Sequence, residues 1–527
     1  MRPTTENKLP FSLAAFVLIL AFAVITFYHL GVRPLQDYDE AIYAQVAHEA
    51  MQSRHQLGFT WLGNPPMHRP ILWFEKPPLM IWLTEAAYAV FGVNEFAARF
   101  WTAIFAVLTL PLTFLFAQKL SKSYGAALLS VASFFAAFQF CEDARILQMD
   151  IPVGFFVLLS LYAFWCAREN KRFYFLFWTA LACGLMVKSV IGLLPLPIVF
   201  VFSVLARDFD YLKIKQFWMG VALFLVLILP WHIIESVQYG KEFWHQYLFY
   251  HLLERYSTAI EGNSGPVAFY LGYFWQEQIF FWCLVMALIY FVIKSIPLQN
   301  RVAQVSQPAV SPTSKSAGRE KSGKPADLEI RDTADLEVCG TTGAFRKDPK
   351  SSKSKAHLLF VTTAFFFIFL FFSTAGTKLP PYILVIYPYA AIAIGMTLAD
   401  LSKWLEKFQK SFGSLVMAVA IVIFLTFGFQ NVRTNLAQEN DPQLVSDKAV
   451  GEYLKGNCLD EPVYFYTVQR PKPSIIFYSD RTVGYFADFQ KSPPPKPFYL
   501  IARETPNVFP DKIIVFSAET EKIYQIR

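Results

Sequence analysis

The most constraining feature of this 527-residue sequence is a series of apolar runs, each about as long as a helix that crosses a bilayer. The hydrocarbon core of a bilayer is roughly 30 Å thick, and an α-helix crosses it in about 20 residues. Hydrocarbon offers no partners to backbone N–H and C=O groups, so such segments must be helical. Composition agrees, because 17% of the residues are charged, whereas a soluble chain carries about a quarter. The sequence therefore predicts an all-α polytopic membrane protein and leaves no soluble alternative.

The apolar runs predict about eleven or more transmembrane helices. One further stretch, 77–92, is apolar but short and contains Glu85. Counting it as a span would invert every later loop against the positive-inside rule, so we predict an interfacial or re-entrant helix there. The eleven predicted spans are 11–30, 97–117, 125–141, 151–167, 173–187, 189–206, 214–231, 267–293, 357–373, 382–399 and 411–429.

The distribution of Lys and Arg predicts the orientation. With the N-terminus inside, every alternate connection is basic, as positive-inside topology requires. The net charge of +7 thus reflects topology, and we expect no nucleic-acid partner. Arg2 and Lys8 precede an apolar run longer than a signal-peptide core, so the first span is predicted to be a retained anchor. The segments predicted outside are 31–96, 142–150, 232–266, 374–381 and the C-terminal tail.

The polar parts of the chain divide it into two domains. We predict a transmembrane domain over 1–430, with juxtamembrane helices in the outer loop 31–96 and a disordered cytoplasmic loop at 297–355, which is rich in Ser, Pro, Lys and Gly. Residues 431–527 are predicted to form a small extracytoplasmic α/β domain. Its expected elements are a helix at 441–456 and strands at 462–468, 474–478, 497–502 and 512–516.

Ionisable residues are unusually dense in the predicted outer loops. Ionisable groups inside or at the mouth of a membrane bundle are costly and usually functional. Just past the first span, Asp37, Asp39 and Glu40 fall within four residues. The alternative interpretation is helix capping, since Asp37 or Asp39 precedes an amphipathic helical pattern whose N-terminus favours acids. Capping explains one carboxylate and not three.

Two further acidic and basic groups have similar alternatives. Glu75 and Lys76 are followed by Pro77-Pro78, which fixes the backbone direction, although a snorkelling Lys beside a neutralising Glu has the same sequence pattern. Asp150 begins the fourth span, where it could instead be an N-cap, with Pro152 in the first turn.

The predicted outer side also holds Arg145, Lys188 and Lys378, although Lys is disfavoured there. An anionic lipid headgroup would supply these cations with a partner. Carboxylates suit a general base acting on a hydroxyl, and cations suit a phosphate leaving group. The combination predicts group transfer from a lipid-linked phosphate donor. It fits a secondary transporter less well, because the ionisable groups cluster on one side of the membrane.

Several motifs, taken in order, resemble one family. The sequence resembles the GT-C glycosyltransferases of the protein O-mannosyltransferase-like branch, which includes bacterial transferases of 4-amino-4-deoxy-L-arabinose to lipid A. The resemblance covers nearly all of 30–400, and residues 297–355 look like an insertion. The matching motifs are Asp39-Glu40 with Tyr43, Phe74-Glu75-Lys76-Pro77-Pro78-Leu79 with Trp82, Gln148-Met149-Asp150-Ile151-Pro152, Val187-Lys188-Ser189 (Ser189 where Gly is usual) and Lys378-Leu379-Pro380-Pro381-Tyr382 (with Val385 where a final Pro is usual).

The resemblance implies an inverting transfer from a polyprenyl-phosphate sugar, undecaprenyl-linked in a bacterium, on the extracytoplasmic face of the inner membrane. The roles that it implies are catalytic for Asp39, Asp150 and Glu40, donor phosphate binding for Lys76, Lys378, Arg145 and Lys188, and acceptor or lipid binding for Tyr43 and Tyr382. It also implies a divalent metal at Glu75 with His251, although His251 is about one residue out of register.

Two rival functions remain open from the sequence. One is a polymerase or ligase that uses a pyrophosphate-linked donor, and the other is a flippase or transporter of lipid-linked sugars. The acceptor is also open, because a lipid A phosphate, a protein hydroxyl and a glycan hydroxyl are all compatible with the motifs.

Overall fold

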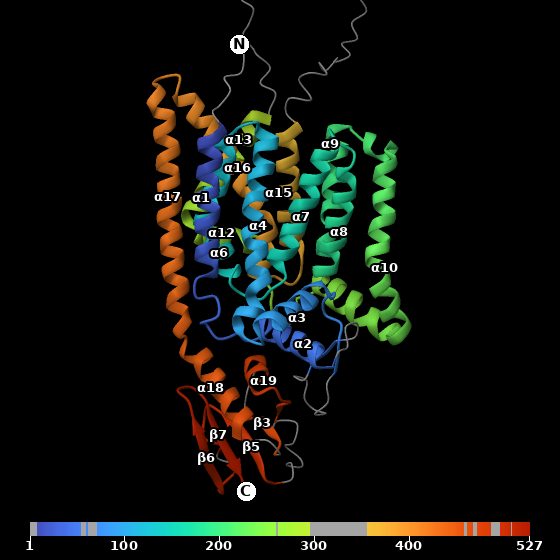
Figure 1. Ribbon diagram of the computed structural model, residues 1–527, viewed down its shortest axis with the longest axis vertical. Helices are drawn as coiled ribbons and strands as arrows, with labels where there is room; N and C mark the ends of the chain where they lie inside the picture. Colours follow the sequence, from blue (N-terminus) through green and yellow to red (C-terminus); the bar gives the residue numbers. More distant parts are fainter. Residues whose placement is uncertain are drawn as a thin grey trace, which may run out of the picture.

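The computed structural model of the protein describes residues 8–53, 59–61, 71–259, 262–295, 356–457, 461–466, 472–485, 496–506 and 509–527. These residues form a helical bundle with a small α/β unit at the end opposite the start of α1 (Figure 1). The loop 297–355, predicted to be disordered, lies outside the described residues.

The bundle consists of long apolar helices. Within the described residues, eight helical segments are long and apolar enough to cross a membrane, and the pair α12 and α13, bent by 119°, could form a ninth span. The helices of the bundle are α1 (Lys8–Phe27), α4 (Glu95–Ser121), α5 (Tyr124–Ser133), α6 (Phe138–Asp143), α7 (Asp150–Ala167), α8 (Phe173–Lys188), α9 (Pro195–Ala206), α10 (Lys215–Trp244), α12 (Phe269–Gln276), α13 (Gln278–Ser295), α15 (Ala356–Thr374), α16 (Tyr387–Leu405) and α17 (Lys410–Ala437).

The protein is therefore a multi-pass membrane protein, as the sequence predicted. The predicted spans 125–141 and 189–206 correspond to the shorter helices α5 and α9, of 10 and 12 residues. They are short because α5 runs into a 3₁₀ turn and α9 begins at Pro195 after another 3₁₀ turn, η2 (Ser189–Leu193). The count of eleven spans thus stays a prediction.

Local sequence signals set several helix ends. Asn94 caps α4 because its side chain accepts a hydrogen bond from the Ala97 N–H at 2.9 Å. Lys122 ends α4 in the left-handed region, and Ser123 then caps α5. Pro380 and Pro381 open the 3₁₀ segment η5 (Pro380–Ile386), where missing N–H groups carry no cost.

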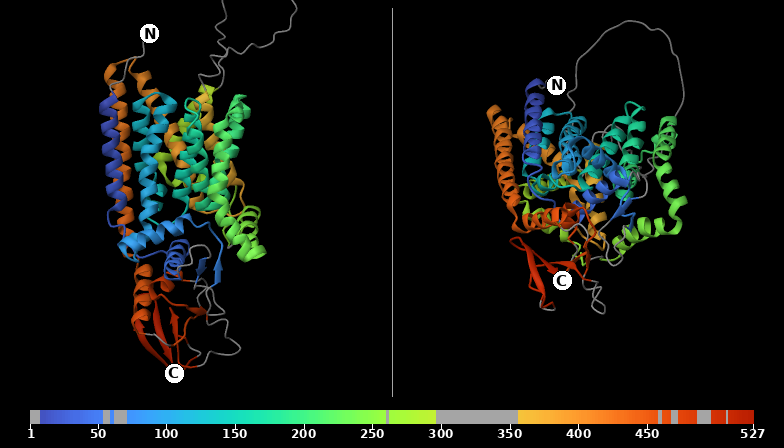
Figure 2. Two further views of the ribbon diagram at one scale, coloured as in Figure 1. Left: turned by 45° about the vertical axis from the view of Figure 1, so that its right-hand side comes forward. Right: turned by 60° about the horizontal axis from the view of Figure 1, so that its bottom comes forward.

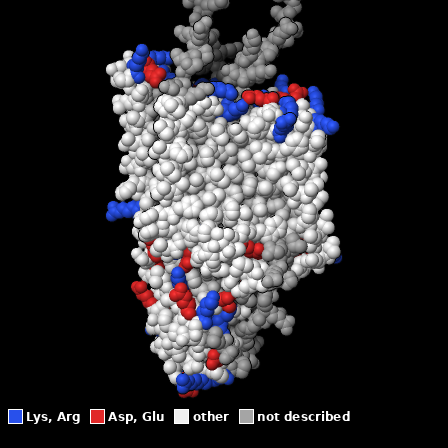
Figure 3. Space-filling model, viewed as in Figure 1, with Lys and Arg blue, Asp and Glu red and all other residues white. Residues whose placement is uncertain are grey.

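Charge marks the two ends of the molecule. On the face shown in Figure 3, Lys and Arg gather at the end that carries the connection between α9 and α10, with a few acidic residues among them. A broad band over the bundle is almost free of charge, and mixed charges cover the opposite end. This distribution matches the alternation of basic connections along the chain.

The segment that follows α1 folds across the end of the bundle beside the α/β unit (Figure 1). It contains α2 (Asp39–Ser53), the paired strands β1 (Phe59–Trp61) and β2 (Ile71–Trp73), and α3 (Leu79–Phe91). The stretch 77–92 is thus a 13-residue helix that packs on α2, α4 and α8. The interfacial or re-entrant character of this helix stays a prediction.

The C-terminal unit, defined as residues 442–527, is a five-stranded sheet with two helices (Figure 2). The strand order is β4-β3-β5-β7-β6, with parallel pairs among β4, β3 and β5 and antiparallel pairs at β5-β7-β6. Its elements are α18 (Pro442–Asn457), β3 (Val463–Phe465), α19 (Pro473–Ser479), β4 (Gly484–Tyr485), β5 (Phe498–Ala502), β6 (Lys512–Ser517) and β7 (Lys522–Ile526).

Two details of this unit differ from the sequence prediction. The predicted strand at 474–478 is wrong, because these residues form the helix α19. Pro473 opens the helix and every residue of α19 is buried, so tertiary packing overrides the strand preference of the Ile-Ile-Phe-Tyr run. The strands β4 and β7 were not predicted. The predicted helix at 441–456 is confirmed as α18.

Candidate active site

A cavity with about 680 Å³ of empty space opens beside η2, α15 and η5. Its polar wall contains Glu75, Lys76, Lys188 and Arg255, and its apolar wall contains aromatic and aliphatic residues from α15, η2 and the segment that follows α10. The apolar wall consists of Ile191, Tyr247, Tyr256, Phe371, Phe372, Ala375 and Tyr382. A cavity with a charged wall and an apolar wall suits an amphiphilic ligand.

Asp150 and Lys188 form the first ion pair of this region. The Lys188 Nζ lies 2.7 and 2.6 Å from the two carboxylate oxygens of Asp150, and the same ammonium group lies 4.6 Å from the centre of the Tyr382 ring. Met149, not Asp150, is the residue that precedes α7, and no side chain caps this helix. The capping interpretation of Asp150 is therefore wrong. The carboxylate instead holds a lysine from the end of α8.

Glu75 joins two cations in the same cavity. The Lys76 Nζ lies 2.5 Å from Glu75 Oε1, and Arg255 Nη2 lies 3.9 Å from the same oxygen. Arg255 also donates a hydrogen bond to the Tyr382 hydroxyl at 3.3 Å. Lys76 is 8% exposed, so it is not a lysine whose ammonium group snorkels into water. Side chains distant in the sequence thus place three cations around one cavity.

Tyr43 and Tyr382 border these charges. The Lys76 ammonium lies 6.0 Å from the centre of the Tyr43 ring, and Tyr43 packs edge-on against Trp73 with ring centres 5.9 Å apart. Burial raises the pKa of Tyr43 well above its ordinary value, so its hydroxyl stays neutral.

Asp39 is the first residue of α2 and keeps access to solvent. Surrounding protein atoms nevertheless desolvate its carboxyl group, and this desolvation, followed by the charge of Glu75, raises its pKa above the ordinary value. The charges of Lys76 and Lys188 act in the opposite direction. Asp39 is therefore within electrostatic range of Glu75, Lys76 and Lys188.

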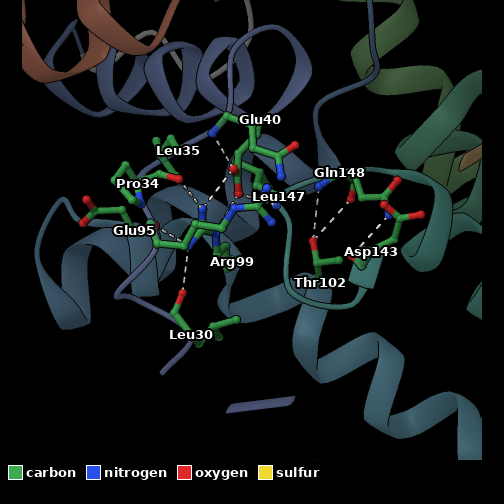
Figure 4. A network of polar contacts seen from close by, with 12 residues as sticks. Leu30, Pro34, Leu35, Glu40, Glu95, Arg99, Thr102, Asp143, Leu147 and Gln148 are labelled. Atoms are coloured by element: carbon green, nitrogen blue, oxygen red, sulfur yellow. Dashed lines mark hydrogen bonds and ion pairs between the residues drawn. The ribbon is translucent and has the colours of Figure 1, made fainter. Parts of the chain in front are cut away.

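Glu40 is not among the residues that line the cavity and instead forms a buried ion pair with Arg99 (Figure 4). Arg99 Nε and Nη2 lie 2.7 and 3.0 Å from the two carboxylate oxygens, and both residues are 1% exposed. The Leu147 N–H donates to Glu40 at 3.0 Å. Arg99 also donates to the carbonyl groups of Leu30, Arg33 and Pro34. Glu40 therefore fastens the loop after α1 to α4.

Lys378 and Arg145 do not line the cavity. The Lys378 ammonium donates to the carbonyl groups of Ser373 and Ala375 at the end of α15, and desolvation lowers its pKa. Arg145 donates to the carbonyl groups of Ile25, Thr26 and Tyr28 at the end of α1. Both cations bind the carbonyl end of a helix, which is the negative end of its dipole.

The described residues do not assemble a ligand set for the implied metal. Glu75 is bound by Lys76 and Arg255, the His251 side chain lies outside the described residues, and no group of three His, Cys, Asp or Glu side chains with metal-binding geometry occurs in the described part. We therefore derive no chemical step through a metal.

Arg255 is a charged residue of the cavity that was not among the predicted site residues, and Ser189 was noted only as a departure from the family motif. Arg255 belongs to a predicted outer segment in which basic residues are disfavoured, and that charge was an available signal. Ser189 lines the cavity with φ of 45°, a backbone region that favours glycine.

Comparison with known proteins agrees with this geometry. Residues 14–247 match the family model "Dolichyl-phosphate-mannose-protein mannosyltransferase". An uncharacterised Aquifex aeolicus protein is 31% identical over 233 residues, which is 43% of this chain and 45% of that protein. The undecaprenyl phosphate-alpha-4-amino-4-deoxy-L-arabinose arabinosyl transferase of Pseudomonas savastanoi pv. phaseolicola is 28% identical over 265 residues, or 48% and 47% of the two chains. The matches thus span less than half of the length of these relatives.

The similarity extends further in structure than in sequence. The crystal structure of ArnT from Cupriavidus metallidurans bound to undecaprenyl phosphate superposes with a TM-score of 0.70 at 16% identity, over 97% of each chain. An archaeal oligosaccharyltransferase from Archaeoglobus fulgidus, AglB, gives 0.53 at 10% identity, over 89% of this chain and 64% of the other. The resemblance deduced from the motifs is confirmed: the chain is similar to the protein mannosyltransferase family of GT-C proteins over residues 14–247 and has the fold of ArnT.

Proposed function

We propose that the protein is an integral membrane glycosyltransferase that moves a sugar from a polyprenyl-phosphate donor, undecaprenyl phosphate in a bacterium, to an extracytoplasmic acceptor. The observation that carries the proposal is the cavity in which Lys76, Lys188 and Arg255 face an aromatic wall. The cations suit a phosphate and the aromatic wall suits a prenyl chain. The ArnT structure of the same fold is described as bound to undecaprenyl phosphate.

In the proposed reaction the acceptor oxygen attacks the anomeric carbon and forms the new glycosidic bond. The bond between the anomeric carbon and the phosphate oxygen breaks, and polyprenyl phosphate leaves with the electron pair. A single displacement of this kind inverts the anomeric configuration. The charge that grows on the leaving phosphate is stabilised by Lys76, Lys188 and Arg255, which Glu75 and Asp150 hold in position.

Asp39 takes the proton of an acceptor hydroxyl in this scheme. A general base works best when its pKa lies near the working pH, and the raised pKa of Asp39 moves it in that direction. Asp150 is the second candidate base, but its two oxygens are occupied by Lys188. Glu40, held by Arg99, orients the loop and does not touch substrate. A phosphate acceptor would need less help from a base.

The proposed location is the bacterial inner membrane, with the N-terminus in the cytoplasm and the cavity and C-terminal unit outside. The cavity residues Glu75 and Lys76 belong to the connection between α1 and α4, at the same end of the bundle as the C-terminal unit (Figure 1). Basic connections gather at the other end (Figure 3).

The test follows the release of free polyprenyl phosphate by purified protein in nanodiscs. The substrates are a panel of polyprenyl-phosphate sugars with mixed membrane acceptors, and Asp39→Asn is compared with wild type. Asp210→Asn is the matched control, because Asp210 is an 82% exposed aspartate on a cytoplasmic connection.

Release by wild type and Asp210→Asn but not by Asp39→Asn supports the donor class and the base. If Asp39→Asn releases as much polyprenyl phosphate as wild type, the glycosyltransferase proposal stands and Asp150 becomes the candidate base. If folded wild type releases nothing from any monophosphate donor, the proposal is wrong. Release from a pyrophosphate-linked donor then indicates a polymerase or ligase, and movement of lipid-linked sugar without a covalent product indicates a transporter.

A further inference from the structure

We infer that the C-terminal unit completes the active site by holding Asp39 in position, with Ser474 and Tyr478 of α19 as positioning residues. The inference rests on the proposed function, because it concerns the carboxylate assigned as base. The key observation is that α19 forms hydrogen bonds with the chain two and four residues before Asp39.

The first contact is at Asp37. Its Oδ1 accepts hydrogen bonds from the Ser474 hydroxyl at 2.6 Å and from the Ser474 N–H at 3.2 Å. Ser474 is fully buried. Asp37, which the sequence offered as a candidate helix cap, thus binds a residue that lies 437 positions later in the chain.

The second contact is at Leu35. Its N–H donates to the Tyr478 hydroxyl at 2.8 Å, and this hydroxyl donates to Glu95 at 3.0 Å. Tyr478 and Ser474 are four residues apart, so they lie on the same face of α19. Glu95 also binds Lys448 of α18 at 2.6 Å. One face of the C-terminal unit therefore holds both the loop and the start of α4.

The backbone between these contacts explains why they matter. Tyr38, directly before Asp39, has φ of 68°, a left-handed conformation that is costly for a residue with a Cβ atom. Such a conformation persists only when its surroundings hold it. On the C-terminal side of Asp39, the ion pair between Glu40 and Arg99 holds the chain against α4 (Figure 4). On the N-terminal side of Asp39, Asp37 and Leu35 form hydrogen bonds with α19.

The C-terminal unit is built to keep α19 in place. Lys472, the residue before α19, is 5% exposed and lies 2.6 Å from Asp447 and 2.7 Å from Glu521. Helix α18 packs so closely on α19 that a Cβ atom at Gly451 would lie 2.4 Å from the Tyr478 Cβ. A movement of α19 would therefore require the whole unit to rearrange. The unit acts on the reaction through the geometry of Asp39, without contacting substrate.

The test compares two double variants of the full chain in nanodiscs. Ser474→Ala with Tyr478→Phe removes both hydroxyl groups that reach the loop. Ser446→Ala with Tyr524→Phe is the matched control, because it removes two hydroxyl groups of buried residues from the same unit, whose partners are Thr520 and Thr505. Turnover is measured on the polyprenyl-phosphate sugar that the wild type uses.

We expect kcat of the first double variant to fall by roughly 10²-fold, the effect of a displacement of about 1 Å in a catalytic group. The KM for donor should stay within about two-fold of wild type, because no residue of α19 is among those that line the cavity. Equal kcat for the two double variants overturns the inference. A loss of donor affinity together with a lower Tm also overturns it, because that result indicates a general structural role.

Asp37 provides an internal check. Asp37→Asn keeps a carbonyl oxygen that can accept both Ser474 hydrogen bonds, so its kcat should stay within about two-fold of wild type. Asp37→Ala loses them and should behave like Ser474→Ala. If Asp37→Asn is as impaired as Asp37→Ala, the charge of Asp37 matters and the positioning role is wrong.

Hydrogen exchange at residues 35–42 separates this inference from the proposed function, because it needs no substrate. Faster exchange in Ser474→Ala with Tyr478→Phe than in the control supports the inference that α19 holds this loop in position. Unchanged exchange overturns it, even if the donor class proves correct. If the double variant exchanges faster than the control but the wild type releases no polyprenyl phosphate, the positioning role of α19 is supported and the proposed function is rejected.

Discussion

At the scale of single residues, the three cations of the cavity pair with two carboxylates. Lys188 pairs with Asp150, and Glu75 lies between Lys76 and Arg255. In this arrangement each of the three cations already has a carboxylate partner. A donor phosphate must share cations that carboxylates already hold, which favours a ligand with a single negative charge over a more highly charged one.

Lys188→Gln should reduce kcat by about 10²-fold or more, as the removal of one transition-state hydrogen-bond donor does in other enzymes. It also leaves Asp150, 5% exposed, without its counterion, so protein stability should fall. Turnover and Tm measure the two effects.

The matched control is Lys213→Gln. Lys213 also pairs with an aspartate, at 3.0 Å, but both side chains are at least 80% exposed, so its removal should change little. Asp150→Asn combined with Lys188→Gln should recover stability but not turnover. A fully active Lys188→Gln would contradict the phosphate-binding role.

The pH dependence should report Asp39. A protonated carboxyl group cannot accept a proton, so the rate falls as the pH drops through the pKa of Asp39. Desolvation and Glu75 raise that pKa, so the fall begins at higher pH than for an ordinary aspartate. Glu75→Gln removes one of the raising charges and should shift the acidic limb to lower pH. A pH–rate profile for the two proteins with a hydroxyl acceptor checks this. An unchanged limb would contradict the assignment.

At the scale of elements, the turn between α8 and η2 positions Lys188. Ser189 adopts φ of 45° and ψ of −132°, and a Cβ atom at Gly192 would lie 2.0 Å from the Gly184 carbonyl carbon. The backbone of η2 therefore lies directly against α8. This close packing holds a serine in a conformation that suits glycine.

Ser189→Gly should increase the free energy of unfolding by about 1 kcal/mol, because it removes the strain of a side chain in this region. Since the backbone is unchanged, turnover should stay near wild type. Ser133→Gly is the control, because Ser133 has ordinary helical angles of −64° and −23°, and glycine should lower stability there by about 0.5–1 kcal/mol. Thermal unfolding in detergent measures both. A lower Tm for Ser189→Gly would show that its hydroxyl matters more than strain.

At the scale of the whole molecule, the two ends of the bundle differ in charge and in the structures that they carry. The C-terminal unit and α2 lie at one end, and the connection between α9 and α10 lies at the other (Figure 1). The basic connections favour the second end as the cytoplasmic one, which is the orientation proposed above.

Cysteine labelling should confirm this orientation. Glu519→Cys lies in the exposed turn between β6 and β7, and Lys213→Cys replaces an 80% exposed side chain at the opposite end. In a background whose six native cysteines are replaced by serine, and in cells whose outer membrane is permeable, an impermeant maleimide should label Glu519→Cys and not Lys213→Cys. Permeabilising the inner membrane should allow both to react. The reverse pattern would place the cavity in the cytoplasm.

The sequence by itself determined the membrane class, the positions of the apolar helices and the motifs that form the cavity. These features are local. A run of about 20 apolar residues must satisfy its own backbone in hydrocarbon, and the proline pairs before α3 and in η5 fix the backbone next to Lys76 and Lys378. The all-α membrane class followed from that local information, and the order of the motifs carried the resemblance to GT-C proteins.

Only the tertiary structure decided which charged residues meet. Lys378 and Arg145 turn to helix carbonyl groups, Glu40 pairs with Arg99, and Arg255 joins the cavity. Lys and Arg side chains are long, so several partners lie within reach and the fold selects among them. The same holds for α19, whose short apolar run fits either strand or helix until packing decides. Its contact with Asp37 joins residues 437 positions apart, a distance over which a single sequence carries no signal.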